Sequence, residues 1–174
     1  MAANPQQSPL SGLARALVQA GRLKEAEAES LLVQSIASKT SLIEQMVAAN
    51  KTTFLDVARF AADKFGYPLL DLAAIDEGNI QKSAVDRKLI ATHRVVPLHK
   101  RGNRLAIAIA DPTNLRALDE IRFQTGLAVD PVIVEENKLG PLVAKLSETV
   151  EESLKTLASD DINLEFTDEQ AQDK

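Results

Sequence analysis

The spacing of apolar positions along the chain changes near Gly66. Residues 10 to 65 place apolar side chains three or four positions apart, which predicts short amphipathic helices. Beyond Gly66, short apolar runs alternate with amphipathic stretches and with turn residues, which predicts strands and helices in alternation. The sequence therefore predicts a helical region over residues 10–66 and an α/β region over residues 67–150.

The helical region is predicted to contain four short helices. Leu10, Leu13 and Leu17 lie on one face of the first helix, and Gly21 is a suitable residue to end it. Ser41 and Glu44 form a capping-box pattern at the start of the third helix. The second and fourth helices carry the apolar stripes Ala28, Leu31, Leu32, Ser35 and Ile36, and Phe54, Val57, Ala58, Ala61 and Phe65.

These helices contain an internal repeat. A shift of 29 residues aligns residues 12–21 with residues 41–50 and pairs Leu17 with Met46. The same shift pairs Gly21 with Asn50, and both residue types tolerate the left-handed backbone of a helix C-cap. Two amphipathic helices can also align by chance, but the matched cap position favours a true repeat. We predict two helix-turn-helix units in tandem.

Residues 67–150 predict the element order β-α-β-β-α-β-α. The predicted strands are residues 67–72, 94–100, 104–111 and 128–136, and the predicted helices are residues 83–93, 114–126 and 138–150. This order indicates an α+β protein whose second part is a small α/β sandwich, with helices on one face of a mixed sheet. Pro97 and Pro131 fall within strands, which predicts edge positions, bulges or strand beginnings.

The junction between residues 104–111 and the next helix is a sharp Asp-Pro-Thr-Asn turn. Asp111 and Thr113 are favourable N-cap residues, and Pro112 suits a first helical turn. The helix is expected to bury Leu115, Leu118, Ile121 and Phe123. Free backbone N–H groups at such a junction can bind anions, but the loop lacks a glycine that would let a phosphate approach closely. We therefore favour a structural turn and cap over a ligand site.

Charge and composition divide the chain further. The chain has no cysteine, and its net charge is −5. Residues 151–174 hold eight acids and two lysines, whereas residues 1–150 are nearly neutral. We expect residues 1–9 to be disordered and residues 151–174 to form an acidic flexible linker. No signal-peptide pattern or long apolar run is present, so we expect a cytoplasmic protein without membrane insertion.

The sequence carries little catalytic chemistry. It contains no GxxxxGK[ST] motif, so this chain is expected to be non-enzymatic and to hold no nucleotide cofactor. His93 and His99 flank a strand without metal-ligand spacing, so no metal site is expected. Few aromatic side chains are available for stacking on bases, which disfavours nucleic acid as a partner. Arg94, Lys100, Arg101 and Arg104 gather near one hairpin, which is either solvated or a contact for a phosphate or an acidic surface.

Two segments support a resemblance to a known family. The segments "FGYPLLDL" and "HRVVPLHKRGNRLAIAIADPTNLRALDEIRFQTGLAVDPVIVEE", together with the helical repeat, resemble the N-terminal region of type IV pilus assembly (extension) ATPases. The N-terminal region of type II secretion ATPases is related. The resemblance covers residues 10–150. It implies a regulatory region that precedes a hexameric motor domain, and it implies that ATP, Mg²⁺ and hexamer formation belong to that motor domain.

The resemblance also bears on the repeat. Some members of this family bind cyclic di-GMP through two copies of a motif like RLGxxLVxxGxIxxxxLxxALxxQ, spaced by five residues. Here the two copies begin Gly12, Leu13, Ala14, Leu17, Val18, Gly21 and Ser41, Leu42, Ile43, Met46, Val47, Asn50. Gly12 and Ser41 replace the motif arginine, whereas Ala14 and Ile43 replace the motif glycine. The closing glutamine falls on Ser35 and Lys64. We predict that the scaffold is kept and the ligand site is lost.

Three functions are compatible with this resemblance. The first is an interaction domain that binds a PilZ-type adaptor and controls pilus extension and twitching motility. The second is a cyclic di-GMP sensor, and the third is a spacer that docks the motor to the inner-membrane pilus platform. Candidate contact residues for an adaptor are Leu13, Leu17, Leu42, Met46, Arg101 and Arg104. The four apolar ones also fit a helical core, and we favour that interpretation.

Overall fold

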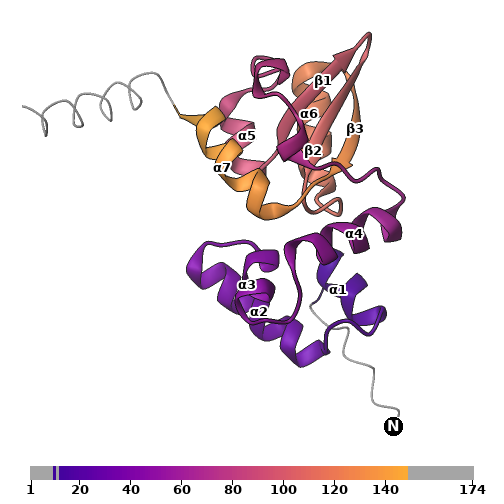
Figure 1. Ribbon diagram of the computed structural model, residues 1–174, viewed down its shortest axis with the longest axis vertical. Helices are drawn as coiled ribbons and strands as arrows, with labels where there is room; N and C mark the ends of the chain where they lie inside the picture. The colour runs from indigo at the N-terminus through magenta and orange to yellow at the C-terminus, as the bar shows by residue number, and fades with distance from the viewer. Residues whose placement is uncertain (1–9, 11, 149–174) are drawn as a thin grey trace, which may run out of the picture.

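The structure is a computed structural model that describes residue 10 and residues 12–148. The predicted disordered N-terminus, residues 1–9, and the predicted acidic linker, residues 151–174, lie outside the described residues. The helical half leads into a half that contains a small sheet, as Figure 1 shows. Within the described part of the chain, no helix is both long enough and apolar enough to cross a membrane.

The helical half contains the four predicted helices. They are α1 (Gly12–Gln19), α2 (Glu25–Ser38), α3 (Leu42–Ala48) and α4 (Phe54–Phe65). Ser41 caps α3 in the predicted capping box, because its hydroxyl accepts a hydrogen bond from the backbone of Glu44. Thr53 caps α4, and Gly66 ends α4 in the left-handed conformation. One stripe residue on α2 was misplaced: Ile36 is exposed rather than buried.

The two aligned helices end in the same backbone geometry. Gly21 and Asn50 both have a positive φ, of 68° and 54°. The next residue in each copy closes the cap: Arg22 N–H donates to the Leu17 carbonyl at 2.9 Å, and Lys51 N–H donates to the Met46 carbonyl at 3.0 Å. These donors and acceptors are related by the same shift of 29 residues. The repeat is thus present in hydrogen bonds as well as in sequence.

The second half has the predicted mixed sheet. Its elements are α5 (Arg87–His93), β1 (Val96–Arg101), β2 (Arg104–Ile109), α6 (Leu115–Thr125), β3 (Ala128–Ile133) and α7 (Glu136–Ser147). The sheet order is β1-β2-β3, with β1 antiparallel and β3 parallel to β2. The register shifts next to Pro97 on the edge strand β1, as its proline predicts. The first predicted strand, residues 67–72, contributes only an isolated bridge between Leu69 and Ile133.

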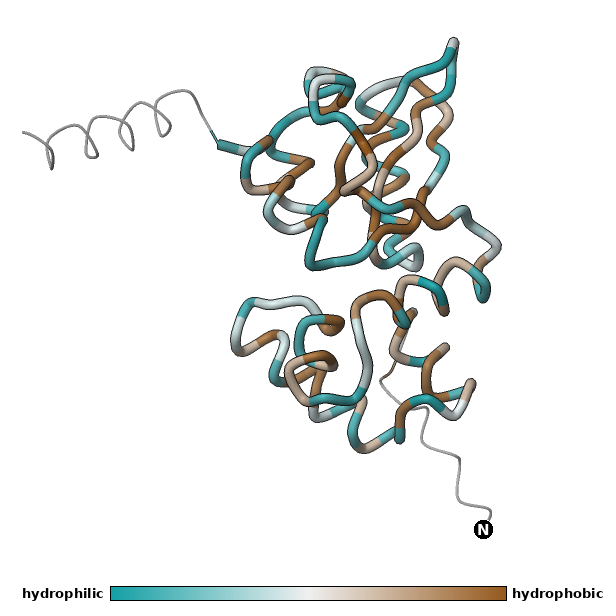
Figure 2. Tube along the Cα trace, viewed as in Figure 1, coloured by the Kyte–Doolittle hydropathy of each residue, from teal (hydrophilic) through white to brown (hydrophobic). Residues whose placement is uncertain are grey.

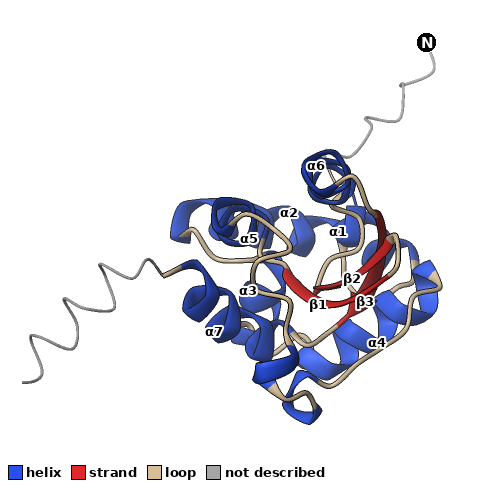
Figure 3. Cartoon of the chain, turned by 90° about the horizontal axis from the view of Figure 1, so that it is seen from above, coloured by secondary structure: helices blue, strands red, loops and turns tan. Residues whose placement is uncertain are grey.

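Helices cover both faces of the sheet rather than one. In Figure 3, α6 lies on one side of the strands, and α4 and α7 lie on the other. The physical reason is the parallel pairing of β2 with β3, which requires α6 to cross over one face, while α7 folds back onto the other. Both faces of β2 are accordingly buried, with Ile107 on one and Ala108 on the other.

Helix α6 presents a different face to the core than its sequence suggested. Ala117, Leu118 and Ile121 are buried, whereas Leu115 is 62% exposed and Phe123 is 93% exposed. The N-cap is Asn114, whose side chain accepts from the Ala117 backbone N–H at 3.2 Å. Asp111 instead accepts from the backbone of Thr113 and shapes the turn before the cap. The Asp-Pro-Thr-Asn segment is therefore a structural turn followed by a cap.

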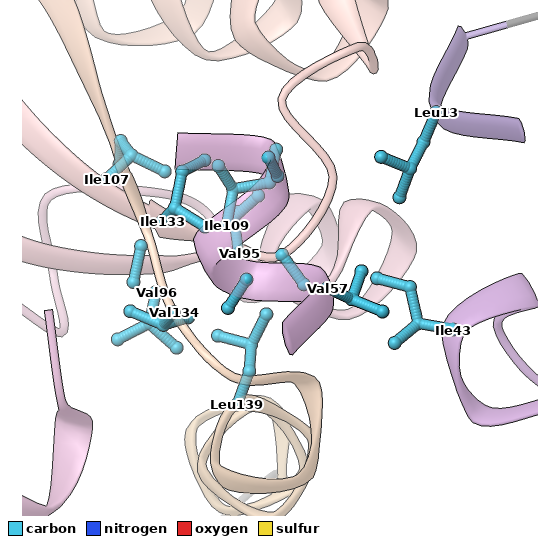
Figure 4. Packing of buried hydrophobic residues seen from close by; sticks show 14 of the residues in the cluster. Leu13, Ile43, Val57, Val95, Val96, Ile107, Ile109, Ile133, Val134 and Leu139 are labelled. Atoms are coloured by element: carbon cyan, nitrogen blue, oxygen red, sulfur yellow. The ribbon is translucent and has the colours of Figure 1, made fainter. Parts of the chain in front are cut away.

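One apolar core runs through both halves. It joins Leu13 and Ile43 of the helical half to Val57 of α4 and to the strand residue Ile109, as Figure 4 shows. Figure 2 shows apolar stretches, in brown, along the tube in both halves. Gly12 adds a close contact, because a Cβ at this position would lie 2.5 Å from the Thr113 hydroxyl oxygen. The division at residue 66 remains a prediction about domains, since the core does not stop there.

Candidate functional site at the junction of the two halves

Arg94 links the two halves by charge. It ends α5 in the left-handed conformation, with φ of 50°. Its Nε donates to Glu136 Oε1 on α7 at 2.8 Å, and its Nη2 donates to the same oxygen. The same Nη2 lies 3.6 Å from Glu44 Oε1 on α3. The guanidinium therefore connects one acid of the helical half with one of the α/β half.

Glu136 is the only acid among the described residues that the fold buries, with 4% of its surface exposed. Burial raises its pKa above the ordinary value, and the Arg94 guanidinium opposes that effect. The opposing effect of Arg94 is important for stability, because a buried carboxylate without a partner is strongly unfavourable. The ion pair with Arg94 therefore lowers the free-energy cost of burying the Glu136 carboxylate at the junction. No local pattern in the sequence indicates this pair, because 42 residues separate its members.

A cavity of about 200 Å³ lies beside this pair. The helical half contributes Leu13, Ser41, Leu42 and Ile43 to its lining, and the other half contributes Arg94, Asp111, Asn114 and Glu136 among others. Several of these are motif positions of the predicted repeat. The structure therefore brings the beginnings of the repeat against the α/β half, at a site with both acidic and basic groups.

Most of the positions that the resemblance associates with a nucleotide are at least partly buried. Leu13, Ala14, Leu17 and Met46 are each 2% exposed, and Ile43 is 4% exposed. Leu42, Val18 and Val47 are partly buried, and Ser41 forms the cap of α3. Gly21 and Asn50 serve the two C-caps. A partner could not touch Leu13, Leu17 or Met46 on this surface, because these side chains form the core.

The basic hairpin is smaller than its sequence indicated. Arg94 lies at the end of α5, in the ion pair with Glu136, and not at the hairpin. Arg104 Nε donates to Asp130 Oδ2 on the neighbouring strand at 2.8 Å, and this ion pair lowers the pKa of Asp130. Arg101 is exposed at the turn. Arg101 is thus the hairpin arginine best placed to meet a partner.

His93 has a partner that the sequence did not reveal. Its Nε2 lies 2.6 Å from Glu120 Oε2 on α6, and its side chain is 9% exposed. His93 and then Arg116 lower the pKa of Glu120 by hydrogen bonding. His99 is exposed on β1. Among residues 10 and 12–148, no group of three or more potential metal ligands is close enough to hold a metal ion.

Two apolar surfaces are open to solvent. The first, which we name the α2 stripe, consists of Val33 and Ile36, with exposures of 68% and 78%. The second is an open groove of about 790 Å³ beside α6, the α6 groove, which is lined by Leu89, Arg116, Asp119, Glu120, Phe123 and Gln124. Sequence reasoning missed both because it assigned Ile36 and Phe123 to buried stripes. Ala117 and Ile121 are four residues apart and therefore share one face of α6. This spacing predicts that Phe123 points away from the buried face.

Comparisons with known proteins give the family. The model of the MshEN domain matches residues 65–153, about half of the chain. The type IV pilus assembly ATPase PilB of Pseudomonas aeruginosa is 38% identical over 165 residues, which are 95% of this chain and 29% of that protein. The protein of the same name from Acinetobacter baylyi is 35% identical over 135 residues, or 78% of this chain and 23% of that protein.

Two solved structures share the fold. MshE, in a structure described as MshE with cdg, is 21% identical with a TM-score of 0.56, covering 79% of this chain and 99% of that chain. The N-terminal domain of XpsE is 23% identical with a TM-score of 0.56, covering 81% of this chain and 97% of that chain. The chain spans less than a third of the length of the curated relatives it matches. This chain belongs to the MshEN domain family, and its homologues are type IV pilus assembly ATPases.

Proposed function

We propose that this chain is a non-catalytic regulatory and protein-interaction domain of a type IV pilus assembly ATPase. In this proposal it binds a PilZ-type adaptor and thereby controls pilus extension and twitching motility. The family supports a regulatory role beside a motor. The observation that carries the interaction role is the α2 stripe, where Val33 and Ile36 stand one helical turn apart and open to solvent. Neighbouring exposed apolar side chains can mark a surface that binds another protein.

A cyclic di-GMP sensor is the second candidate, because a structural neighbour is described as MshE with cdg. The residues here weigh against it. The positions of the motif arginine are Gly12 and Ser41, and the positions of the motif glycine are the buried Ala14 and Ile43. A ligand phosphate would find neither a guanidinium nor open backbone at these positions. Adaptor binding is therefore the better-supported function.

The adaptor could use either of two surfaces, and these lie far apart. Figure 1 shows the β1–β2 hairpin and helix α2 at opposite ends of the molecule. Apolar anchors supply most of the binding free energy, whereas charges at a rim mainly accelerate association. We therefore assign the contact to the α2 stripe and expect Arg101 to contribute little.

The test is calorimetric titration of the full chain with a purified PilZ-type adaptor. We expect a dissociation constant of about 1 μM or lower, and Val33→Ser with Ile36→Ser should weaken it at least about tenfold. The matched control is Phe123→Ser, which removes an exposed apolar side chain from another surface. Arg101→Glu tests the hairpin. Absence of binding at micromolar concentration would overturn the adaptor proposal and favour a spacer that docks the motor to the pilus platform.

A further inference from the structure

The exposed side of α2 extends beyond the α2 stripe toward the start of the helix. Its residues are Glu25, Glu29, Val33 and Ile36. A helix turns by about 100° per residue, so these four side chains leave the axis within an arc of about 80°. Glu29 is half-buried and the other three are exposed. Together they form one surface, the α2 face, with an acidic half followed by an apolar half.

The two glutamates of the α2 face have no cationic partner within the described part of the chain. Glu27, between them in sequence, points to another side of the helix and is paired. Its Oε1 accepts a hydrogen bond from Lys51 Nζ at 2.7 Å, and its Oε2 accepts one from the Lys24 backbone N–H at 3.2 Å. The contrast within one helix shows that the fold neutralises the glutamate that faces the body and leaves Glu25 and Glu29 uncompensated.

The helix itself gains little from this acidic pair. Like charges four residues apart on a helix repel each other. The helix dipole favours an acid in the first turn, which accounts for Glu25. It does not account for Glu29, because the dipole effect fades beyond that turn. An uncompensated acid beside two exposed apolar side chains is therefore better explained by a contact outside the chain.

The α2 face determines what chemistry such a contact needs. Val33 and Ile36 can pack against any apolar patch and do not distinguish partners by charge. The acidic half does distinguish them, because an acidic partner surface would be repelled there and a basic one attracted. Charges at the edge of an interface also accelerate association with a partner of opposite sign. Charge complementarity thus favours a partner with cations next to its apolar patch.

We propose that the α2 face docks a surface of the adaptor on which lysine or arginine side chains flank an apolar patch. The apolar patch packs on Val33 and Ile36, while the cations pair with Glu25 and Glu29. This inference rests on the proposed function and specifies the chemistry of the partner at the same surface. The apolar contact holds the complex, and the acidic half selects the partner and speeds its association.

The test is calorimetric titration of the full chain with a purified PilZ-type adaptor at low and high salt. Glu25→Gln with Glu29→Gln should weaken binding about fivefold in about 50 mM NaCl. The effect should fall below about twofold in about 500 mM NaCl, because salt screens exposed charges. The matched control is Asp63→Asn with Glu148→Gln, which removes the same charge from α4 and from the end of α7 and should leave the dissociation constant unchanged.

Each other outcome counts against the inference. Unchanged binding by the Glu25 and Glu29 variant would show that these acids lie outside the contact, and tighter binding would show that the partner surface is acidic. Equal weakening by the control would mean that only net charge matters. If binding depends on Val33 and Ile36 but not on the glutamates, this inference fails and the proposed function stands. If the wild-type chain does not bind the adaptor, both fail. Circular dichroism verifies the fold of each variant.

Discussion

Replacement of Arg94 should measure how much its ion pair with the buried Glu136 stabilises the fold. In Arg94→Met, the carboxylate of Glu136 remains buried, with 4% exposure, and loses the guanidinium that donates to its Oε1. Breaking a buried ion pair from one side costs about 3–5 kcal/mol. Arg94 is itself 41% exposed, so water can partly replace it. We therefore expect a loss of about 2–3 kcal/mol in the free energy of unfolding at pH 7.5.

The loss should depend on pH in one direction. Burial already raises the pKa of Glu136, and removing Arg94 takes away the strongest influence that lowers it. An acid whose pKa is raised by folding favours the folded state below its unfolded pKa, and this contribution is lost as the pH rises through the folded pKa. Protonation of Glu136 at acidic pH should therefore neutralise the uncompensated charge. The deficit of Arg94→Met should shrink to about 1 kcal/mol or less there.

Urea unfolding followed by circular dichroism at pH 5 and pH 7.5 measures both quantities. Adding Glu136→Gln to Arg94→Met should recover most of the lost stability, because no charge then remains in the junction. Arg104→Met is the matched control: it breaks an arginine–carboxylate pair with Asp130 that lies in solvent, and stability should barely change. A deficit below about 1 kcal/mol at pH 7.5, or one that is equal at both pH values, would refute the reasoning.

Three further predictions concern other features. Gly12→Ala should destabilise the fold by about 1–2 kcal/mol, because Gly12 has a φ of 58° and a new Cβ would strike Thr113; urea unfolding measures this, and an unchanged midpoint would contradict the close contact. Cyclic di-GMP should bind with a dissociation constant above about 1 μM, since charge-assisted hydrogen bonds to the ligand are lost; calorimetry decides. The chain alone should release no phosphate from ATP above a heat-inactivated control, because it contains no P-loop sequence.

Local signals predicted most of the fold. Gly102 and Asn103 mark the hairpin between two apolar runs, and Gly21 and Asn50 mark matching helix ends. Each of these signals acts within a few residues, where backbone sterics and hydrogen bonds decide the structure. The number and order of helices followed from such signals. Strand 67–72 did not form as predicted, because beyond a single bridge the segment turns into short 3₁₀ helices.

The candidate sites depend on contacts that no local signal records. Arg94 was grouped with the hairpin because it is near it in sequence, yet a left-handed cap turns it toward Glu136. Phe123 was assigned to the core because it is aromatic. Position on the helix decided otherwise, since Leu118 and Ile121 set the buried face and Phe123 lies about 140° from Leu118 around the axis. Hydrophobic identity alone therefore misplaces apolar residues that lie on the solvent-facing side of a helix.

The two copies of the repeat are alike at their C-terminal ends and differ at their beginnings. Their C-terminal ends share one hydrogen-bonded cap geometry, which is a common way for a helix to end. Their beginnings differ from each other and have separate structural duties: Gly12 approaches Thr113 of the α/β half, and Ser41 caps α3. A ligand with two equivalent halves would require equivalent contacts at both beginnings. Because Gly12 and Ser41 offer different chemistry, we expect the repeat to serve the packed junction beside Arg94, and we propose that recognition uses the exposed surfaces.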